Sequence, residues 1–202
     1  MNRQPCSPPR RVLLLAALGA ALAGEACQKA APAFAGIDLT GADYGRDFSL
    51  QDPDGRTRTM ADFRGKVVML FFGFTQCPDA CPTALARAAE VRRLLGPQAD
   101  RLQVIFVTID PERDGAAVLK EYTHAFDPSF LGLRADADGT AAVAKEFKVI
   151  YRKVPTGSSY TMDHTAFTYV LDTQGRLRLA LRHELSARDA ARDVSTLLAQ
   201  AG

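Results

Sequence analysis

The stretch "GKVVMLFFGFTQCPDACPTAL", residues 65–85, decides the fold because it leads from a buried strand through two cysteines into a helix. Residues 65–74 form an apolar run without alternation, which is typical of a central strand buried on both faces. Apolar residues near helical spacing then predict a helix from about residue 82 to 95, ending at a Gly-Pro pair. Cys77 therefore follows the end of a strand and Cys81 begins a helix, at the sheet edge where sites of open α/β folds gather.

The rest of the chain supplies alternating strands and helices. We predict an N-terminal hairpin from 47–52 and 56–60, a buried strand at 101–110, helices at 114–126 and 139–147, a strand at 148–154, a turn-rich segment at 155–164, and strands at 165–172 and 177–181. A final helix begins after Ser186, which forms a capping box with Asp189, and ends near Gln200. This order predicts one α/β domain over 47–202, with a central mixed sheet flanked by helices on both faces.

The charge balance excludes one class of function. The formal net charge is +2 over 202 residues, and the first 26 residues contribute three arginines and one glutamate. The remaining chain is therefore neutral, and it contains no run of Lys and Arg. Such a chain lacks the electrostatic footprint of a nucleic-acid-binding protein, so we expect no nucleic-acid partner.

The N-terminus is predicted to direct export. Residues 1–26 combine two arginines, an apolar core at 12–24 and a small-x-small cleavage site, and the apolar core is short for a membrane span. Residues 27–46 are predicted to form a linker. Cys27 follows an imperfect lipobox, so it is either a lipid attachment site that tethers the protein to the membrane or an incidental cysteine. Export places the domain in the periplasm, a compartment that permits disulfides.

Cys77 and Cys81 are predicted to act as a pair with two possible functions. Each is followed by a proline, and their position before a helix favours the thiolate form that both redox attack and metal binding require. A spacing of four residues lets the sulfurs form a disulfide or clamp a soft metal ion between them. With a histidine as a third ligand, the site would suit copper.

Three histidines are available as that third ligand. His124 lies within a predicted helix and His183 between the last strand and the last helix, positions where a surface or packing role is expected. His164 lies between a loop rich in Gly and Ser and a buried strand, so it is placed to face the site across the sheet edge. It is the candidate ligand.

Three motifs together resemble those of a known family. "FFGFTQCPDACPTAL" (71–85), "VTIDPERD" (107–114) and "DHTAFTYVLD" (163–172) are similar to motifs of the Sco/SenC family, and the resemblance extends from about residue 45 to the C-terminus. It implies a thioredoxin-like fold and a copper site formed by Cys77, Cys81 and His164, which binds Cu(I) and also Cu(II). It further implies a non-enzymatic metallochaperone that delivers copper to the CuA site of cytochrome c oxidase subunit II and keeps the cysteines of that site reduced. Another copper chaperone would act as the donor.

The alternative is a thiol-disulfide oxidoreductase or redox sensor that uses Cys77 and Cys81. The three intervening residues depart from the two of thioredoxin, which counts against it. Around the copper site, Asp163 is expected either to orient the imidazole of His164 or to be a solvated loop acid. Asp79 is expected either to tune the charge of the site or to stabilise the helix start. Within "VTIDPERD", Asp110, Pro111 and Asp114 are expected to be structural, ending a strand and starting a helix.

Overall fold

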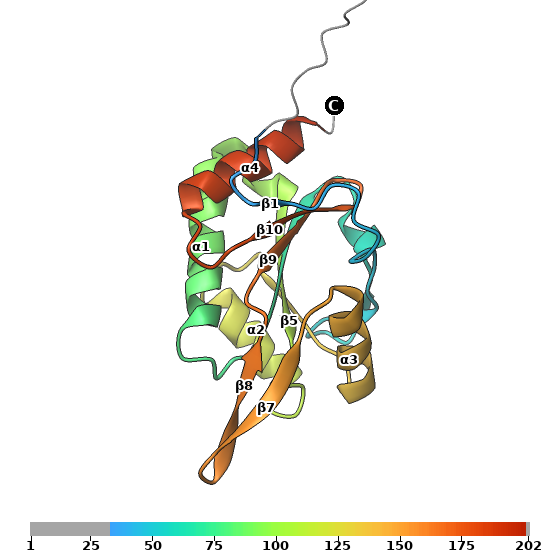
Figure 1. Cartoon of the computed structure of the whole chain (residues 1–202), viewed down its shortest axis with the longest axis vertical. Coiled ribbons are helices and arrows are strands. Elements are labelled where there is room, and N and C mark those ends of the chain that lie inside the picture. The colour runs from blue at the N-terminus through green and yellow to red at the C-terminus, as the bar shows by residue number, and fades with distance from the viewer. Residues whose placement is uncertain (1–32, 201–202) are drawn as a thin grey trace, which may run out of the picture. The chain divides into compact units, whose positions relative to one another are not determined.

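Strand β4 (Val67–Gly73) lies inside a six-stranded mixed sheet in the computed structural model, which describes residues 33–200 (Figure 1). The strand order is β1-β10-β9-β4-β5-β6. β4 runs parallel to β5 and antiparallel to β9, β6 is parallel to β5, and β10 is antiparallel to both β9 and β1. The five neighbours are β1 (Ile37–Asp38), β5 (Leu102–Thr108), β6 (Leu131–Leu133), β9 (Thr168–Leu171) and β10 (Leu177–Leu181). The predicted α/β class with a mixed sheet is confirmed.

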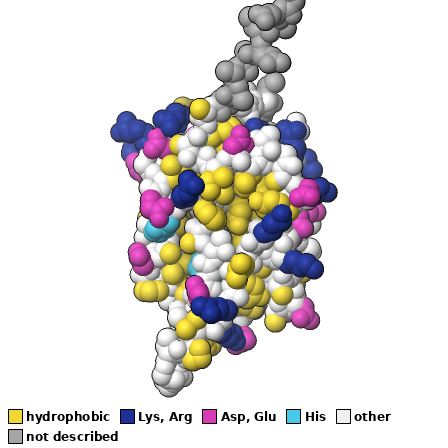
Figure 2. Space-filling view, in the orientation of Figure 1, with side chains coloured by type: hydrophobic (Ala, Val, Ile, Leu, Met, Phe, Trp, Pro, Cys, Tyr) yellow, Lys and Arg dark blue, Asp and Glu magenta, His cyan; other side chains and the backbone are white. Residues whose placement is uncertain are grey.

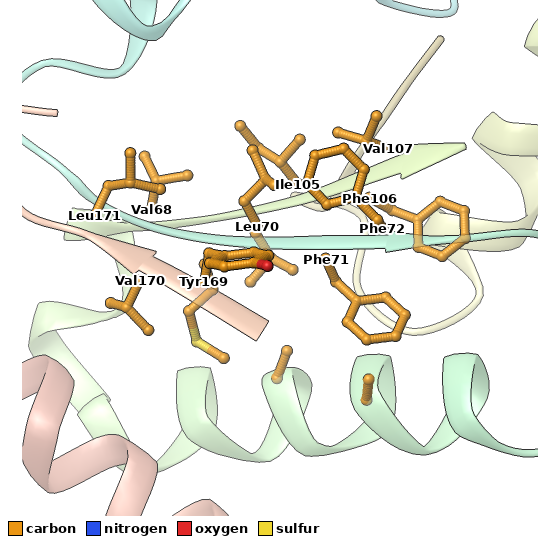
Figure 3. Packing of buried hydrophobic residues seen from close by; sticks show 14 of the residues in the cluster. Val68, Leu70, Phe71, Phe72, Ile105, Phe106, Val107, Tyr169, Val170 and Leu171 are labelled. Carbon is orange, nitrogen blue, oxygen red and sulfur yellow. The ribbon is translucent and has the colours of Figure 1, made fainter. Parts of the chain in front are cut away.

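The apolar run predicts β4 correctly because both faces of the strand are covered. All seven of its residues are buried. Figure 3 shows Val68, Leu70 and Phe72 on one side of the strand and Phe71 on the other, above a helix. Burying each such side chain stabilises the fold by about 1.5–3 kcal/mol, which makes this strand the centre of the core.

Helices cover the sheet on both sides (Figure 1). α1 (Ala80–Leu95) and α4 (Ala187–Ala199) pack together on one side, and α3 (Ala137–Glu146) lies on the other. α2 (Ala116–His124) packs against β6. α4 begins at the predicted cap, since the hydroxyl of Ser186 accepts the N–H of Asp189 at 3.1 Å. Two short 3-10 helices, η1 (Met60–Phe63) and η2 (Gly96–Arg101), complete the set of helices in this part of the chain.

Two small antiparallel hairpins accompany the main sheet. β2 (Leu50–Gln51) pairs with β3 (Thr57–Arg58), which confirms the predicted N-terminal hairpin. β7 (Tyr151–Thr156) pairs with β8 (Ser159–His164), and this β7–β8 hairpin projects from the body of the domain (Figure 1). The prediction of a turn-rich segment at 155–164 is wrong there. Only its centre is a turn, at Gly157, whose φ of +60° suits a residue without a side chain.

The folded unit begins earlier than the predicted boundary at residue 47. It starts at Phe34, and Ile37 and Asp38 extend the sheet as strand β1. The buried carboxylate of Asp193 accepts the N–H groups of Ala35 at 3.1 Å and Gly36 at 2.8 Å. The second half of the predicted 27–46 linker is therefore part of the domain. The predicted signal segment 1–26 and Cys27 lie outside the described residues.

The surface carries mixed charge. On the face shown in Figure 2, acidic and basic side chains are interspersed over the domain. None of the helices in residues 33–200 combines the length and the apolar character that crossing a bilayer would require.

Candidate metal centre

Cys77 and Cys81 are brought together by the start of helix α1. Cys77 lies in the loop after β4 and is half-buried, whereas Cys81 lies in the first helical turn and is fully buried. The N–H groups of a first helical turn have no partner within the helix, and that of Cys81 donates to Sγ of Cys77 at 3.4 Å. Pro82 fits the same turn because it has no N–H to satisfy. The spacing of four residues therefore lets the backbone of one cysteine hold the sulfur of the other.

The two sulfurs share one proton. The thiol of Cys81 donates to Cys77, and this bond lowers the pKa of Cys77 to about 3 although burial opposes the shift. The backbone N–H groups of Asp79 and Cys81 add to the lowering. The same shared bond raises the pKa of Cys81, and burial raises it further. Neither cysteine forms a disulfide, and the opposite pKa shifts make Cys77 the more acidic of the two sulfurs.

His164, the last residue of β8, directs one ring nitrogen at the sulfurs. Its Nδ1 lies 2.9 Å from the carbonyl oxygen of Thr165. Because a carbonyl only accepts, Nδ1 must carry the proton, which leaves the lone pair on Nε2. Nε2 lies 3.9 Å from Sγ of Cys81. The rings of Phe71 and Phe74 contact the imidazole edge-on at centroid distances of 6.1 and 6.0 Å and hold its plane.

The three side chains form a group that could hold a metal ion. One ligand atom from each of Cys77, Cys81 and His164 lies within 4.8 Å of the other two. Thiolates with an imidazole form a soft ligand set, which favours copper or zinc over magnesium or calcium. Structural zinc sites have four ligands, whereas this group supplies three, so the set fits copper better.

The structure decides between the two roles expected of Asp163 and leaves those of Asp79 as predictions. Asp163 does not orient the imidazole: it pairs with Arg152 at 2.9 Å on the exposed side of the hairpin, and the carbonyl of Thr165 orients the ring instead. Asp79 occupies the N-cap position of α1, but its side chain makes no capping bond to the helix backbone and accepts the hydroxyl of Thr83 at 3.3 Å.

The other two histidines lie apart from this group. His124 is the last residue of α2 and is exposed. His183 lies between β10 and α4, where its carbonyl accepts a hydrogen bond from Arg87. Neither belongs to the metal-ligand group found among the described residues.

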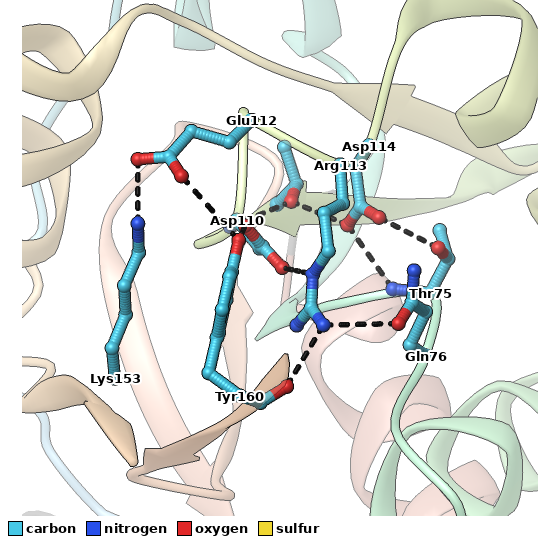
Figure 4. Close-up of polar contacts among 9 residues, drawn as sticks. Thr75, Gln76, Asp110, Glu112, Arg113, Asp114, Lys153 and Tyr160 are labelled. Atoms are coloured by element: carbon cyan, nitrogen blue, oxygen red, sulfur yellow. Dashed lines mark hydrogen bonds and ion pairs between the residues drawn. The ribbon is translucent and has the colours of Figure 1, made fainter. Parts of the chain in front are cut away.

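The "VTIDPERD" segment contributes more than the expected strand end and helix start. The buried carboxylate of Asp114 accepts the N–H of Thr75 at 3.1 Å and the hydroxyls of Thr75 and Thr108, each at 2.6 Å (Figure 4). Arg113 pairs with Asp110 and reaches both the cysteine loop and the β7–β8 hairpin. The sequence has no signal for the contacts of Asp114 with Thr75 and of Arg113 with Gln76 and Tyr160, because they join residues 37 to 47 positions apart.

Fold and site together define a thioredoxin-like α/β protein with two cysteines and a histidine at the end of its central strand. The profile of the SCO1/SenC family matches residues 38–199, and the chain belongs to this family.

Relatives and solved structures agree with that assignment. The chain is 38% identical over 135 residues to a SCO2-like protein of Rickettsia felis. This alignment covers 65% of this chain and 66% of the Rickettsia protein. The chain is 42% identical over 133 residues to the mitochondrial SCO2 homolog of Bos taurus, covering 64% of this chain but 50% of the bovine protein. The chain thus spans between half and two thirds of these relatives.

Two solved structures have the same fold. Copper-bound ScoI of Bradyrhizobium japonicum has a TM-score of 0.71 and 40% identity, covering 76% of this chain and 99% of that chain. Apo Sco1 of Thermus thermophilus has a TM-score of 0.72 and 38% identity, covering 85% and 99%.

Proposed function

We propose that this protein binds copper, as Cu(I) and also as Cu(II), and delivers it to the CuA site of cytochrome c oxidase subunit II. The observation that carries the proposal is the convergence of Cys77, Cys81 and His164, whose ligand atoms lie within 4.8 Å of one another. In this role the protein is a metallochaperone and copper is its cargo.

Family membership supports both halves of the proposal. The Bradyrhizobium relative binds copper on the same fold at 40% identity. The Sco family is described as one of cytochrome c oxidase assembly proteins. Delivery to subunit II and the receipt of copper from another chaperone follow from the family resemblance and need their own experiments.

The site is open enough for cargo to enter and leave. Cys77 and His164 are half-buried, and a cavity of about 250 Å³ borders His164, lined also by Ile150, Arg152, Asp163 and Thr165. Ile150 is 77% exposed at its rim. Because Cys77 and His164 are partly exposed, an incoming ligand can reach them while the buried Cys81 still holds the ion.

An anaerobic Cu(I) titration against a competing chelator tests the binding. We expect one copper per domain. The Cu(I) affinity should fall by roughly 100-fold or more in each of three variants, Cys77→Ser, Cys81→Ser and His164→Ala. Loss of a residue that only supports a ligand typically costs about 10–100-fold, so loss of a ligand should cost more. His124→Ala is the matched control, since His124 is exposed and remote from the group. Unchanged affinity in His164→Ala would overturn the proposed site.

Transfer is tested with the soluble CuA domain of subunit II as acceptor. Copper-loaded protein should fill the reduced acceptor in the presence of a chelator that captures free Cu(I), because direct ligand exchange releases no free ion. Complete inhibition by the chelator would show that copper leaves by dissociation and would contradict delivery by contact.

One observation favours a second candidate, a thiol-disulfide oxidoreductase or redox sensor. The low pKa of Cys77 and its bond to Cys81 give a thiolate with a second thiol adjacent. A reducible Cys77–Cys81 disulfide that turns over on a partner protein, with activity retained in His164→Ala, would favour this candidate. Loss of copper binding without loss of thiol chemistry in that variant separates the two functions.

For the location we propose the periplasm, with Cys27 as the site of a lipid anchor to the membrane. The support is the export pattern of residues 1–26 and the imperfect lipobox before Cys27. Fractionation and mass spectrometry of the expressed full chain test both points. A soluble chain cleaved near residue 23 and without a lipid would contradict the anchor.

A further inference from the structure

The metal ligands lie outside the main sheet, although β9, which begins four residues after His164, pairs with β4. Cys77 and Cys81 follow β4 of the six-stranded sheet, whereas His164 ends the β7–β8 hairpin, whose strands pair only with each other among the described residues. The ladder of the main sheet reaches Thr168 but does not include His164, so it does not by itself fix the distance between His164 and the sulfurs. Side-chain contacts between the hairpin and the body must contribute to that distance.

Those contacts lead to one short segment. Apart from the contacts of His164 itself, every side-chain hydrogen bond or ion pair found between strands β7–β8 and the rest of residues 33–200 involves residues 110–113. Lys153 pairs with Glu112 at 2.6 Å, and the hydroxyl of Tyr160 donates to Asp110 at 2.8 Å. Both appear in Figure 4. The segment after β5 is thus the polar anchor of the hairpin, in addition to the apolar packing of Met162 in the core.

Arg113 is the residue of that segment that touches both ligand-bearing parts. The Nη1 atom of Arg113 donates to Oε1 of Gln76 at 3.0 Å and to the carbonyl oxygen of Tyr160 at 2.8 Å. Its Nε atom pairs with the carboxylate of Asp110 (Figure 4). The guanidinium carbon lies 3.8 Å from the centroid of the Tyr160 ring and 5.9 Å from that of Phe74. Its side chain is 16% exposed, so these contacts are largely shielded from water.

The positions of the touched residues make the contact relevant to the metal. Gln76 directly precedes Cys77. Tyr160 lies four residues before His164 on the same strand, and residues i, i+2 and i+4 of a strand share a face. A side chain that fixes Gln76 and Tyr160 together therefore fixes Cys77 against His164.

We propose that Arg113 is a positioning residue for the metal site, which clamps the β7–β8 hairpin to the cysteine loop and so holds His164 at its distance from the sulfurs. The planar guanidinium, with donors in a fixed fork, suits this role, and a lysine has one flexible point charge instead. The proposal rests on the proposed copper site, but the clamp also orders the metal-free protein. It can therefore be tested without copper.

The first test measures amide hydrogen exchange of the metal-free protein. Arg113→Met should speed exchange of the β7–β8 amides by about tenfold or more and leave β4 and β5 unchanged, because only the hairpin loses its anchor. Arg152→Met is the matched control: it removes an exposed ion pair with Asp163 inside the hairpin and no contact with the body. That variant should change exchange by less than about fivefold. Hairpin exchange in Arg113→Met equal to wild type would overturn the clamp.

The second test is a double-mutant cycle on Cu(I) affinity. Arg113→Met should weaken binding by about 10–100-fold, the range of lost outer-shell support. In a His164→Ala background it should weaken binding by less than about threefold, because the residue then has no ligand left to position. An undiminished loss in that background would show that Arg113 acts elsewhere and would overturn the proposal.

Two provisions keep the outcomes distinct. Removing Arg113 leaves the buried Asp110 unpaired, so the double variant Asp110→Asn with Arg113→Met provides a neutral pair if the single variant does not fold. It should reproduce both effects, and a double variant with wild-type exchange and affinity would again refute the clamp. Failure of His164→Ala to weaken binding would reject the copper site itself while the exchange result still decides the clamp.

Discussion

Gly73, in the middle of the "FFGF" run, leaves the space that Cys81 occupies. It is the last residue of β4 and faces the start of α1. A Cβ atom built at this position would lie 2.7 Å from Sγ of Cys81 and 2.8 Å from Cε2 of Phe106. Ordinary contacts lie at about 3.5–4.0 Å, so an alanine would be roughly 1 Å too close to the sulfur. The substitution Gly73→Ala must therefore move Cys81, the strand, or both.

The expected cost has a stability part and a metal part. Overpacking of a tight core site costs about 1–3 kcal/mol, and in a domain of this size about 2 kcal/mol corresponds to a Tm lower by about 4–8 °C. Ligand distances in metal sites hold within about 0.2 Å, so a displaced Cys81 should also weaken Cu(I) binding, by about tenfold or more. Thermal unfolding of the metal-free protein and the chelator titration measure the two parts separately.

Gly132→Ala provides the matched control for Gly73→Ala. A Cβ at Gly132 in β6 would lie 3.0 Å from Cβ and 3.2 Å from the carbonyl oxygen of Leu119, far along the sheet from the cysteines. We expect this variant to lose stability and to keep wild-type copper affinity. Wild-type Tm and affinity in Gly73→Ala would refute the reasoning about Cys81. Equal affinity losses in both variants would show that the effect spreads through the whole domain.

Three further predictions concern titration and capping. Although burial alone would raise the pKa of Asp172, hydrogen bonds from Arg176 and nearby N–H groups hold it below its usual range. The stability that this carboxylate contributes is present above about pH 4 and is lost as the pH falls through the folded-state pKa. Asp172→Asn should therefore lower the free energy of unfolding in urea by about 2 kcal/mol at pH 7, and by progressively less below about pH 4. An equal cost at pH 7 and pH 3 would contradict this. Because its pKa is about 3, Cys77 should react with iodoacetamide at pH 5 before Cys81 does, as peptide mapping would show; preferential labelling of Cys81 would reverse the assignment. Ser186→Ala removes the cap of α4 and should lower the free energy of unfolding by about 1 kcal/mol, and an unchanged value would show that the cap contributes nothing.

The parts of the fold predicted from sequence are those whose pattern is local. The run at Val67–Gly73 is apolar because both faces of β4 are buried, and the Ser186 cap is a local hydrogen bond. β1 has two residues and is a strand only because Ile37 and Asp38 meet β10 about 140 residues later. β6 has three residues with a glycine in the middle, too few to show a period.

The hairpin and the support of the imidazole show a second limit. β7 is largely exposed and Met162 is the one buried residue of β8, so burial imposes little alternation on the hairpin, and the glycine and serines of the turn dominate the pattern. Asp163 is adjacent to His164 in sequence, but successive side chains of a strand point to opposite faces. The neighbour therefore points away from the metal site and pairs with Arg152, while a backbone carbonyl that no motif reveals holds the ring.

The three motifs that identify the family are joined physically by the middle one. The first supplies Cys77 and Cys81 and the third supplies His164, and in the main sheet these two motifs meet only where Phe71 of β4 pairs with Thr168 of β9, a pairing that does not include the ligands. Asp114 binds the loop that follows β4, and its neighbour Arg113 reaches the hairpin. A pair of adjacent side chains at the end of β5 thus bridges both ligand-bearing segments. This arrangement explains how a site assembled from residues 83 positions apart obtains a defined geometry before any metal arrives.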